Sequence, residues 1–103
     1  MSGFSKIDID FKMMMLQASI LEGIAQQIET LGEQSLDTTL QSIAASWKGD
    51  NANLYLGKGE LLKSNTITTA QNLRDIASRL KSRTQFIYSK EKEAAAIAAK
   101  RTY

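Results

Sequence analysis

The chain contains no cysteine, no histidine and no proline in its 103 residues. Without cysteine a disulfide framework cannot form, and the redox compartment is left open. Because histidine and cysteine are both absent, the usual zinc ligand sets are excluded, as are Ser-His-Asp and Cys-His nucleophile arrangements. We therefore expect a protein that is not an enzyme, with no catalytic residue, no metal site and no cofactor.

Tryptophan is almost absent too, and its single occurrence, Trp47, lies near the midpoint of the chain. The tripeptide Trp47-Lys48-Gly49 interrupts what otherwise reads as one long helical pattern. Gly49 can adopt the left-handed conformation that helix C-termini commonly require, and Asp50 or Asn51 can cap a following helix. The segment predicts a turn over residues 47–50, with the Trp47 ring closing the tip of a helical hairpin.

The first helix is predicted over about residues 8–46, since no proline breaks it. It opens at Asp8 or Asp10, whose carboxylates can accept hydrogen bonds from the free N–H groups of a first turn. An acid/base dyad is the alternative for this pair of carboxylates. We favour capping, because no cleft-forming segment surrounds them.

Apolar residues in the first helix recur at alternating steps of three and four, as on a helix that faces a neighbouring helix. The stripe consists of Phe11, Met14, Ala18, Leu21, Ile24, Ile28 and Leu31, and resumes at Leu36, Leu40, Ile43 and Trp47. The step from Leu31 to Leu36 is five residues, so the stripe rotates there. Gly32 lies in that step and predicts a slight bend or local loosening.

The second helix is predicted over about residues 51–90, with Gly57 and Gly59 weakening its first turns. The stretch Gly57-Lys58-Gly59 does not match a phosphate-binding loop, which needs GxxxxGK[ST] after a strand. Residues 91–103 are alanine-rich with little apolar anchorage beyond Ile97. We expect them to form a flexible or frayed helical tail, because short isolated helices are marginal in water.

The net charge of +2 hides an asymmetry between the two arms. Residues 1–57 carry three Lys/Arg and seven Asp/Glu, a balance of −4, whereas residues 58–103 carry ten and four, a balance of +6. Two such arms attract each other when they fold antiparallel. Nucleic-acid binding is the weaker interpretation of the basic arm, because its cations are dispersed and few aromatics are interleaved for base stacking.

These patterns predict an all-α fold in which residues 1–103 form one antiparallel two-helix hairpin. A two-helix hairpin has no enclosed core, and small chains without disulfides or metals often depend on association. We therefore expect two hairpins to pair into a dimeric four-helix bundle, with Met13–Met15 filling the core or the dimer interface. The predicted dimer seam comprises Met14, Leu21, Ile24, Ile28, Leu31, Leu73, Ile76 and Leu80.

The N-terminal segment lacks the apolar region of a signal peptide, because the run from Met13 to Leu16 is only four residues long. No segment approaches the ~20 apolar residues that span a bilayer. We expect synthesis in the cytoplasm and no stable membrane insertion. Any export must use a route that needs no Sec signal peptide.

With its central Trp47-Lys48-Gly49, its length of about a hundred residues and its two helices, the chain resembles the WXG family of helical-hairpin proteins. These are early-secreted-antigen-like substrates of type VII secretion. The resemblance implies export as a folded homodimer, or as a heterodimer with a related hairpin protein or toxin N-terminal domain. It also implies a secretion ATPase of the FtsK/SpoIIIE type, an extracellular destination and, in some members, a role in virulence. Trp47 and Gly49 would contribute to the export signal.

The family's second export signal is a tyrosine followed four residues later by an acid. Here Tyr88 is followed at that distance by Lys92, while Glu91 and Glu93 lie one residue to either side. Either recognition tolerates a shifted acid, or a dimer partner supplies the complete signal. The second option favours a dedicated partner for a larger secreted protein.

The resulting expectation is a small non-enzymatic protein exported by a type VII (ESX-like) system. It would act as a dimeric substrate or effector, or as the adaptor partner of a larger secreted toxin. The alternative is a cytoplasmic coiled-coil assembly or scaffold protein that is never exported. In that case Trp47-Lys48-Gly49 would only form the turn and would have no role in recognition.

Overall fold

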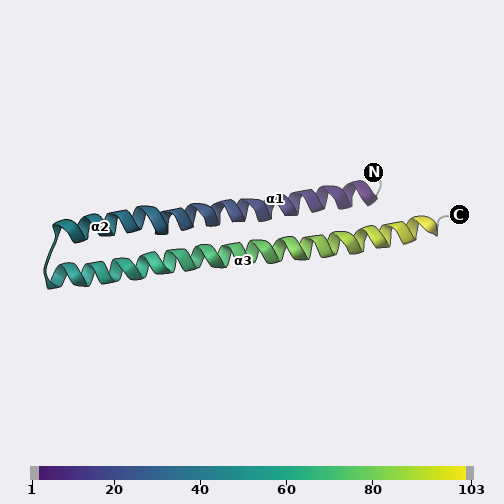
Figure 1. The fold of residues 1–103 in the computed structure, drawn as a ribbon. Helices are drawn as coiled ribbons and strands as arrows, with labels where there is room; N and C mark the ends of the chain where they lie inside the picture. The colour runs from purple at the N-terminus through teal and green to yellow at the C-terminus, as the bar shows by residue number, and fades with distance from the viewer. Residues whose placement is uncertain (1–2, 102–103) are drawn as a thin grey trace. The chain divides into compact units, whose positions relative to one another are not determined.

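The computed structural model describes residues 3–101, and all the regular structure in that range is helical. The first arm runs through α1 (Gly3–Thr30), the π-helix η1 (Leu31–Leu36) and α2 (Asp37–Ser46). The second arm is the single helix α3 (Asp50–Lys100), as Figure 1 shows. The predicted all-α class with two long helical arms is confirmed. Pairing into a dimeric bundle stays a prediction.

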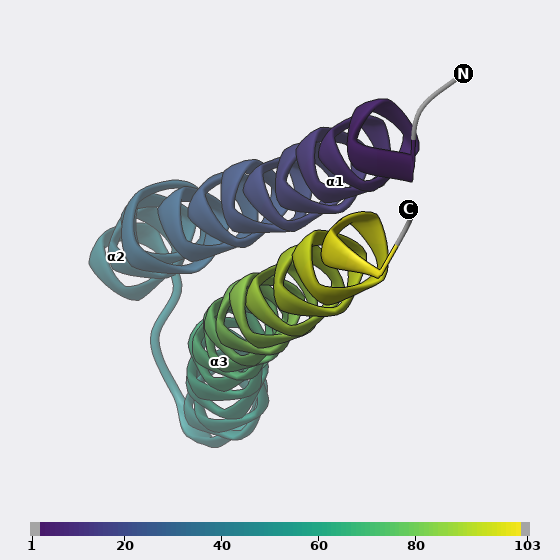
Figure 2. The same ribbon diagram turned by 90° about the vertical axis from the view of Figure 1, so that its right-hand side faces the viewer.

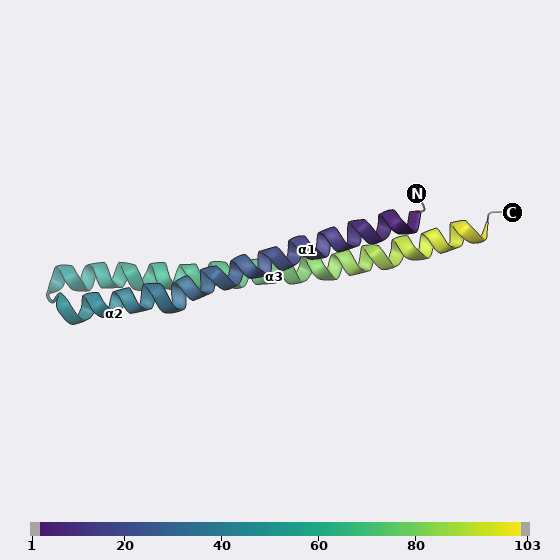
Figure 3. The same cartoon turned by 90° about the horizontal axis from the view of Figure 1, so that it is seen from above.

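The chain divides into two compact units. The terminal unit combines Met1–Leu21 with Asp75–Tyr103, and the turn unit is Glu22–Arg74. In the terminal unit the start of α1 (purple) runs beside the end of α3 (yellow) in both rotated views (Figures 2 and 3). In the turn unit the first part of α3 runs back along α2 (Figure 1). Whether residues 1–103 behave as one domain stays a prediction.

The most deeply buried residues are small, and no large side chain in the described range is fully buried. Those in the terminal unit are Ala18, Ala77 and Thr84, and those in the turn unit are Ala25, Gly32, Ala52 and Ala70. Seven-residue steps link Ala18, Ala25 and Gly32, and likewise Ala70, Ala77 and Thr84. Since the distance between helix axes depends on the side chains at the contact, small residues let two helices approach closely.

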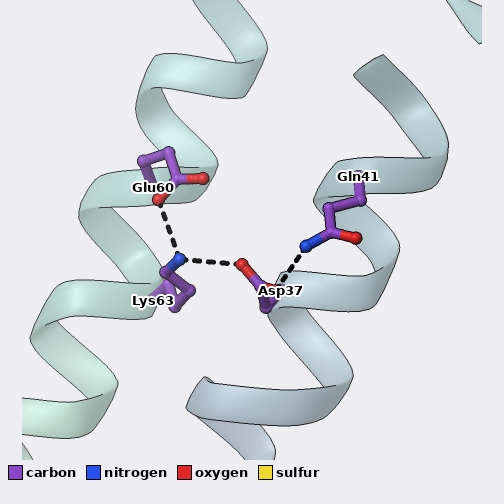
Figure 4. A network of polar contacts seen from close by, with 4 residues as sticks. All are labelled: Asp37, Gln41, Glu60 and Lys63. Atoms are coloured by element: carbon purple, nitrogen blue, oxygen red, sulfur yellow. Dashed lines mark hydrogen bonds and ion pairs between the residues drawn. The ribbon is translucent and has the colours of Figure 1, made fainter. Parts of the chain in front are cut away.

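Ion pairs between the arms join an acid of the first arm to a cation of the second, as the charge asymmetry predicts. In the turn unit Lys63 Nζ lies 2.9 Å from Asp37 Oδ1, and Arg74 pairs with Glu29. Figure 4 shows that Lys63 also contacts Glu60, at 3.1 Å, and that Gln41 donates to Asp37 at 2.7 Å. The hydrogen bond to Asp37, reinforced by Glu60, raises the pKa of Lys63 above its usual value.

The five-residue step in the first stripe is accommodated by the π-helix η1, over Leu31–Leu36. A π-helix carries an extra residue per turn, so it absorbs the change of phase without breaking the arm. Gly32 is buried within it, and a Cβ there would lie 2.9 Å from Ile67 Cγ1 and 3.3 Å from Thr66 Cγ2. The glycine predicted to mark a loosened bend is therefore a point of close helix–helix contact.

The predicted start of the first helix is wrong, because α1 begins at Gly3 and contains both Asp8 and Asp10. An N-cap residue has a non-helical backbone, so neither carboxylate caps this helix. The end of the second helix also differs from the prediction, since α3 continues to Lys100. The alanine-rich segment has high helix propensity, and Lys90 and Glu93 pair across one turn at 3.7 Å. Residues 102–103 of the predicted tail lie outside the described range.

Candidate functional site

The turn between the arms is short and is held by hydrogen bonds at the end of α2 and the start of α3. Trp47 ends α2 in an extended conformation (φ −126°, ψ 122°), and its N–H donates to Ile43 O at 2.8 Å. Lys48 Nζ donates to Ala44 O at 2.7 Å, so a second carbonyl at the C-terminus of α2 has a partner.

Gly49 has the positive φ expected of it, at 111°. Its position in the motif differs from the prediction, however. Gly49 O accepts the N–H of Asn53 at 3.0 Å, so the glycine opens α3 and does not close α2. Asp50 is accordingly already in the first turn of α3. The positive-φ conformation, which glycine adopts without strain, therefore serves the start of the second arm.

Trp47 packs against the second arm and is also accessible. Its ring stacks on Tyr55 with centroids 5.6 Å apart and an interplanar angle of 29°, and Lys58 Nζ lies 5.9 Å from the Tyr55 centroid. The Trp47 side chain is nevertheless 43% exposed. The predicted closure of the tip is thus made through Tyr55, with one part of the indole left to solvent.

Tyr88, the predicted tail signal, lies inside α3 and not in a segment beyond it. Its hydroxyl donates to Asp8 Oδ1 at 2.8 Å, and its ring stacks on Phe11 with centroids 4.2 Å apart. Lys92 Nζ lies 3.2 Å from the same carboxylate oxygen. The hydrogen bond from Tyr88 is the main reason why the pKa of Asp8 is lower than its usual value, and the contact with Lys92 lowers this pKa further. Tyr88 therefore joins the two segments of the terminal unit.

The terminal unit contains a groove of about 400 Å³, which sequence reasoning missed. Its apolar lining includes Ile7, Met13, Met14 and Ile87, and its carboxylates are Asp10 from α1 and Glu91 from α3. Both acids are exposed, and neither forms an ion pair within residues 3–101. The helical spacing of Ile7, Asp10 and Met14, and that of Ile87 and Glu91, places each set on one helix face, but it does not give the register between α1 and α3 that brings the two sets together. Glu93, the other acid of the predicted signal, pairs with Lys90 instead.

The structure separates the predicted dimer seam into two sets. Leu21, Ile28, Leu73 and Leu80 are half-buried, whereas Met14, Ile24, Leu31 and Ile76 are exposed. On α1 the exposed set extends to Ile9, Met13, Leu16 and Ile20. These residues also recur at three- and four-residue steps, so α1 carries a second apolar stripe that the sequence analysis did not distinguish. The role of this set in a dimer stays a prediction.

Two further classes of site are absent from residues 3–101. None of its helices, over the described residues, has a stretch apolar enough to cross a membrane. Within residues 3–101, no three acidic side chains gather as a metal ion would require.

The chain matches no protein-family model, no curated protein and no solved structure. The resemblance to the WXG family consequently depends on Trp47, Gly49 and the two helical arms. It enters below as a proposal.

Proposed function

We propose that the chain is a WXG-like protein exported by a type VII secretion system, as a dimeric substrate or as the adaptor of a larger secreted toxin. One observation carries this proposal. The Trp47-Lys48-Gly49 motif occupies the turn between two long helical arms, and Trp47 is 43% exposed there.

The geometry of the turn suits recognition by another protein. Binding energy in interfaces is concentrated in a few anchors, among which tryptophan and tyrosine are enriched. Trp47 is fixed by its backbone hydrogen bond to Ile43 and by its stack on Tyr55, so little conformational freedom would be lost on binding. A secretion ATPase of the FtsK/SpoIIIE type is the protein that we propose binds this surface.

Association with another helical hairpin is supported by what the single chain leaves exposed. Its accessible surface is 7490 Å². A compact monomer of 11.4 kDa would expose about 5,800 Å². Sixteen large apolar residues in the described range are exposed, and large exposed apolar patches mark interaction sites. A homodimer or a heterodimer would cover part of this surface.

Export is tested by measuring the protein in culture supernatant with and without the secretion ATPase. We expect release from the wild-type cell and loss of release from the ATPase deletion, with the cytoplasmic level maintained. Unchanged release in the deletion, or no release in either strain, would count decisively against the proposal.

The role of the motif is tested with Trp47→Leu, compared with Tyr55→Leu as the matched control. Both variants remove the Trp47–Tyr55 stack, but only the first removes the indole. We expect Trp47→Leu to reduce export about tenfold or more, as expected for a hot-spot residue, while helicity by circular dichroism is retained. Tyr55→Leu should reduce export much less.

Equal export of both variants would favour the alternative function, a coiled-coil scaffold in which the motif only makes a turn. The seven-residue spacing of small buried residues is the observation that favours that alternative.

A further inference from the structure

The groove of the terminal unit has two carboxylates that form no ion pair within residues 3–101. Asp10 and Glu91 lie along the groove, one on each helix, beside the apolar Met13, Met14 and Ile87. Lys6 lines the adjoining, shallower part of the groove and pairs with neither acid. The combination of apolar surface and two unpaired acids fits a ligand that is apolar with a positive charge.

Three acids of the first arm differ from Asp10 in this respect, whereas Glu33, like Asp10, forms no ion pair within residues 3–101. Asp8, Glu29 and Asp37 each have a cation of the second arm within ion-pair distance. These three acids therefore form ion pairs with the opposite helix of the same chain. The acids of the groove are left for a different molecule.

The turn unit carries a surface of the opposite character, on the first turns of α3. Leu54, Lys58, Leu61 and Leu62 are spaced so that they share one face of the helix. The three leucines are 55–62% exposed. Lys58 has no ion pair within the described chain, and its only contact is with the exposed Tyr55 ring. We call this set the Lys58 stripe.

We propose that the groove is occupied by the Lys58 stripe of a second copy of this chain, with Lys58 placed between Asp10 and Glu91. The leucines of the stripe would cover the Met13–Met14–Ile87 surface, where the flexible methionines adapt to their shape. Charge complementarity then fixes which part of one chain meets which part of the other.

In the proposed dimer the contact forms twice, because each chain contributes one groove and one stripe. A two-fold dimer is built in this way, because residue i of one copy meets residue j of the other and the reverse holds as well. Pairing of groove with groove is disfavoured, because it would bring four carboxylates together.

The inference rests on the self-association included in the proposed function, but it does not depend on export. It is tested with two charge-reversal variants. The groove variant carries Asp10→Lys and Glu91→Lys, and the stripe variant carries Lys58→Glu. As a control, Asp75→Lys with Glu93→Lys makes the same change of charge as the groove variant. Asp75 and Glu93 are bound only within α3, and neither lines the groove.

Sedimentation equilibrium at low salt measures the dimer dissociation constant of each protein. The groove variant and the stripe variant should each dimerise at least about tenfold more weakly than the wild type, since like charges would then meet in both contacts. The control should dimerise within about threefold of the wild type, as expected for charges outside the contact.

The decisive experiment mixes the groove variant with the stripe variant. In a mixed dimer one contact pairs the reversed groove with the reversed stripe, and the other contact is wild type, so both are again complementary. We expect the mixture to form a heterodimer at wild-type strength. A salt concentration of about 1 M should weaken the selectivity, because screening then shortens the Debye length to about 3 Å.

A failure of the mixture to pair overturns the inference, as does wild-type dimerisation by either variant alone, or a wild-type chain that stays monomeric. These results concern self-association, and export is tested separately by the ATPase deletion. Conversely, a charge-swapped heterodimer in a protein that is never released would uphold the inference and reject the secretion proposal.

Discussion

Among single residues, Asp8 makes two polar contacts between the two segments of the terminal unit. It accepts the Tyr88 hydroxyl and pairs with Lys92, while Phe11 stacks on the Tyr88 ring. These contacts favour the charged carboxylate and lower its pKa. The hydrogen bond that Lys92 donates to Asp8 raises the pKa of Lys92. A residue that the sequence assigns to a helix cap thus joins α1 to α3.

Stability should depend on the charge of Asp8 in a defined pH range. Because the folded-state pKa is lowered, the stabilisation is fully present above the unfolded value of about 4 and is lost as the pH falls through the lower folded value. We expect Asp8→Asn to lower the urea midpoint at pH 7 and to match the wild type near pH 2. Asp75→Asn, which changes an exposed pair within α3, should have a smaller effect at pH 7. An equal deficit for Asp8→Asn at both pH values would contradict this account.

At the scale of the helices, glycines at different positions have opposite roles. A Cβ at Gly57 would meet nothing within 4 Å, whereas one at Gly32 would press on Ile67 and Thr66, and one at Gly59 on Leu40. β-branched side chains such as Ile67 and Thr66 have little freedom to move aside. The weakening of the helix start by Gly57 and Gly59 stays a prediction, and of the two only Gly57 has open space for a Cβ.

Alanine substitution should separate these roles. Gly57→Ala is expected to stabilise the fold by about 1 kcal/mol, the difference in helix propensity. Gly32→Ala should destabilise it by about 1–3 kcal/mol, since overpacking outweighs the gain in propensity. Urea unfolding followed by circular dichroism measures both. Stabilisation by Gly32→Ala would show that η1 does not pack closely against α3.

The helical arms and the turn could be predicted from the sequence, because apolar periodicity and the Trp47–Gly49 break are local signals. The start at Gly3 could not, since Asp8 is held by Tyr88, a residue 80 positions away. Within the single chain the buried contact is made by Ala18, which belongs to the predicted stripe, and by Ala25 and other small residues that the apolar pattern did not single out. The dimer role of Met14 and Ile24 stays a prediction. Of the candidate site, the turn was predictable and the acidic groove was not, because it requires the register between α1 and α3.

At the scale of the whole molecule, the notable property is how little the single chain buries. Alanines supply its buried apolar residues in the described range, and leucines, isoleucines and methionines remain accessible. Small chains without disulfides or metals usually need further buried surface for stability. The secretion proposal and the groove–stripe inference both draw on this property, because each assigns a second hairpin to the exposed surface.

The most direct test of this central claim is the mass of the purified chain in solution, measured by light scattering together with its helicity. Association of two copies predicts a mass of twice 11.4 kDa, with helicity and mass lost together on dilution or mild denaturation. A stable, fully helical species of 11.4 kDa at micromolar concentration would contradict the account.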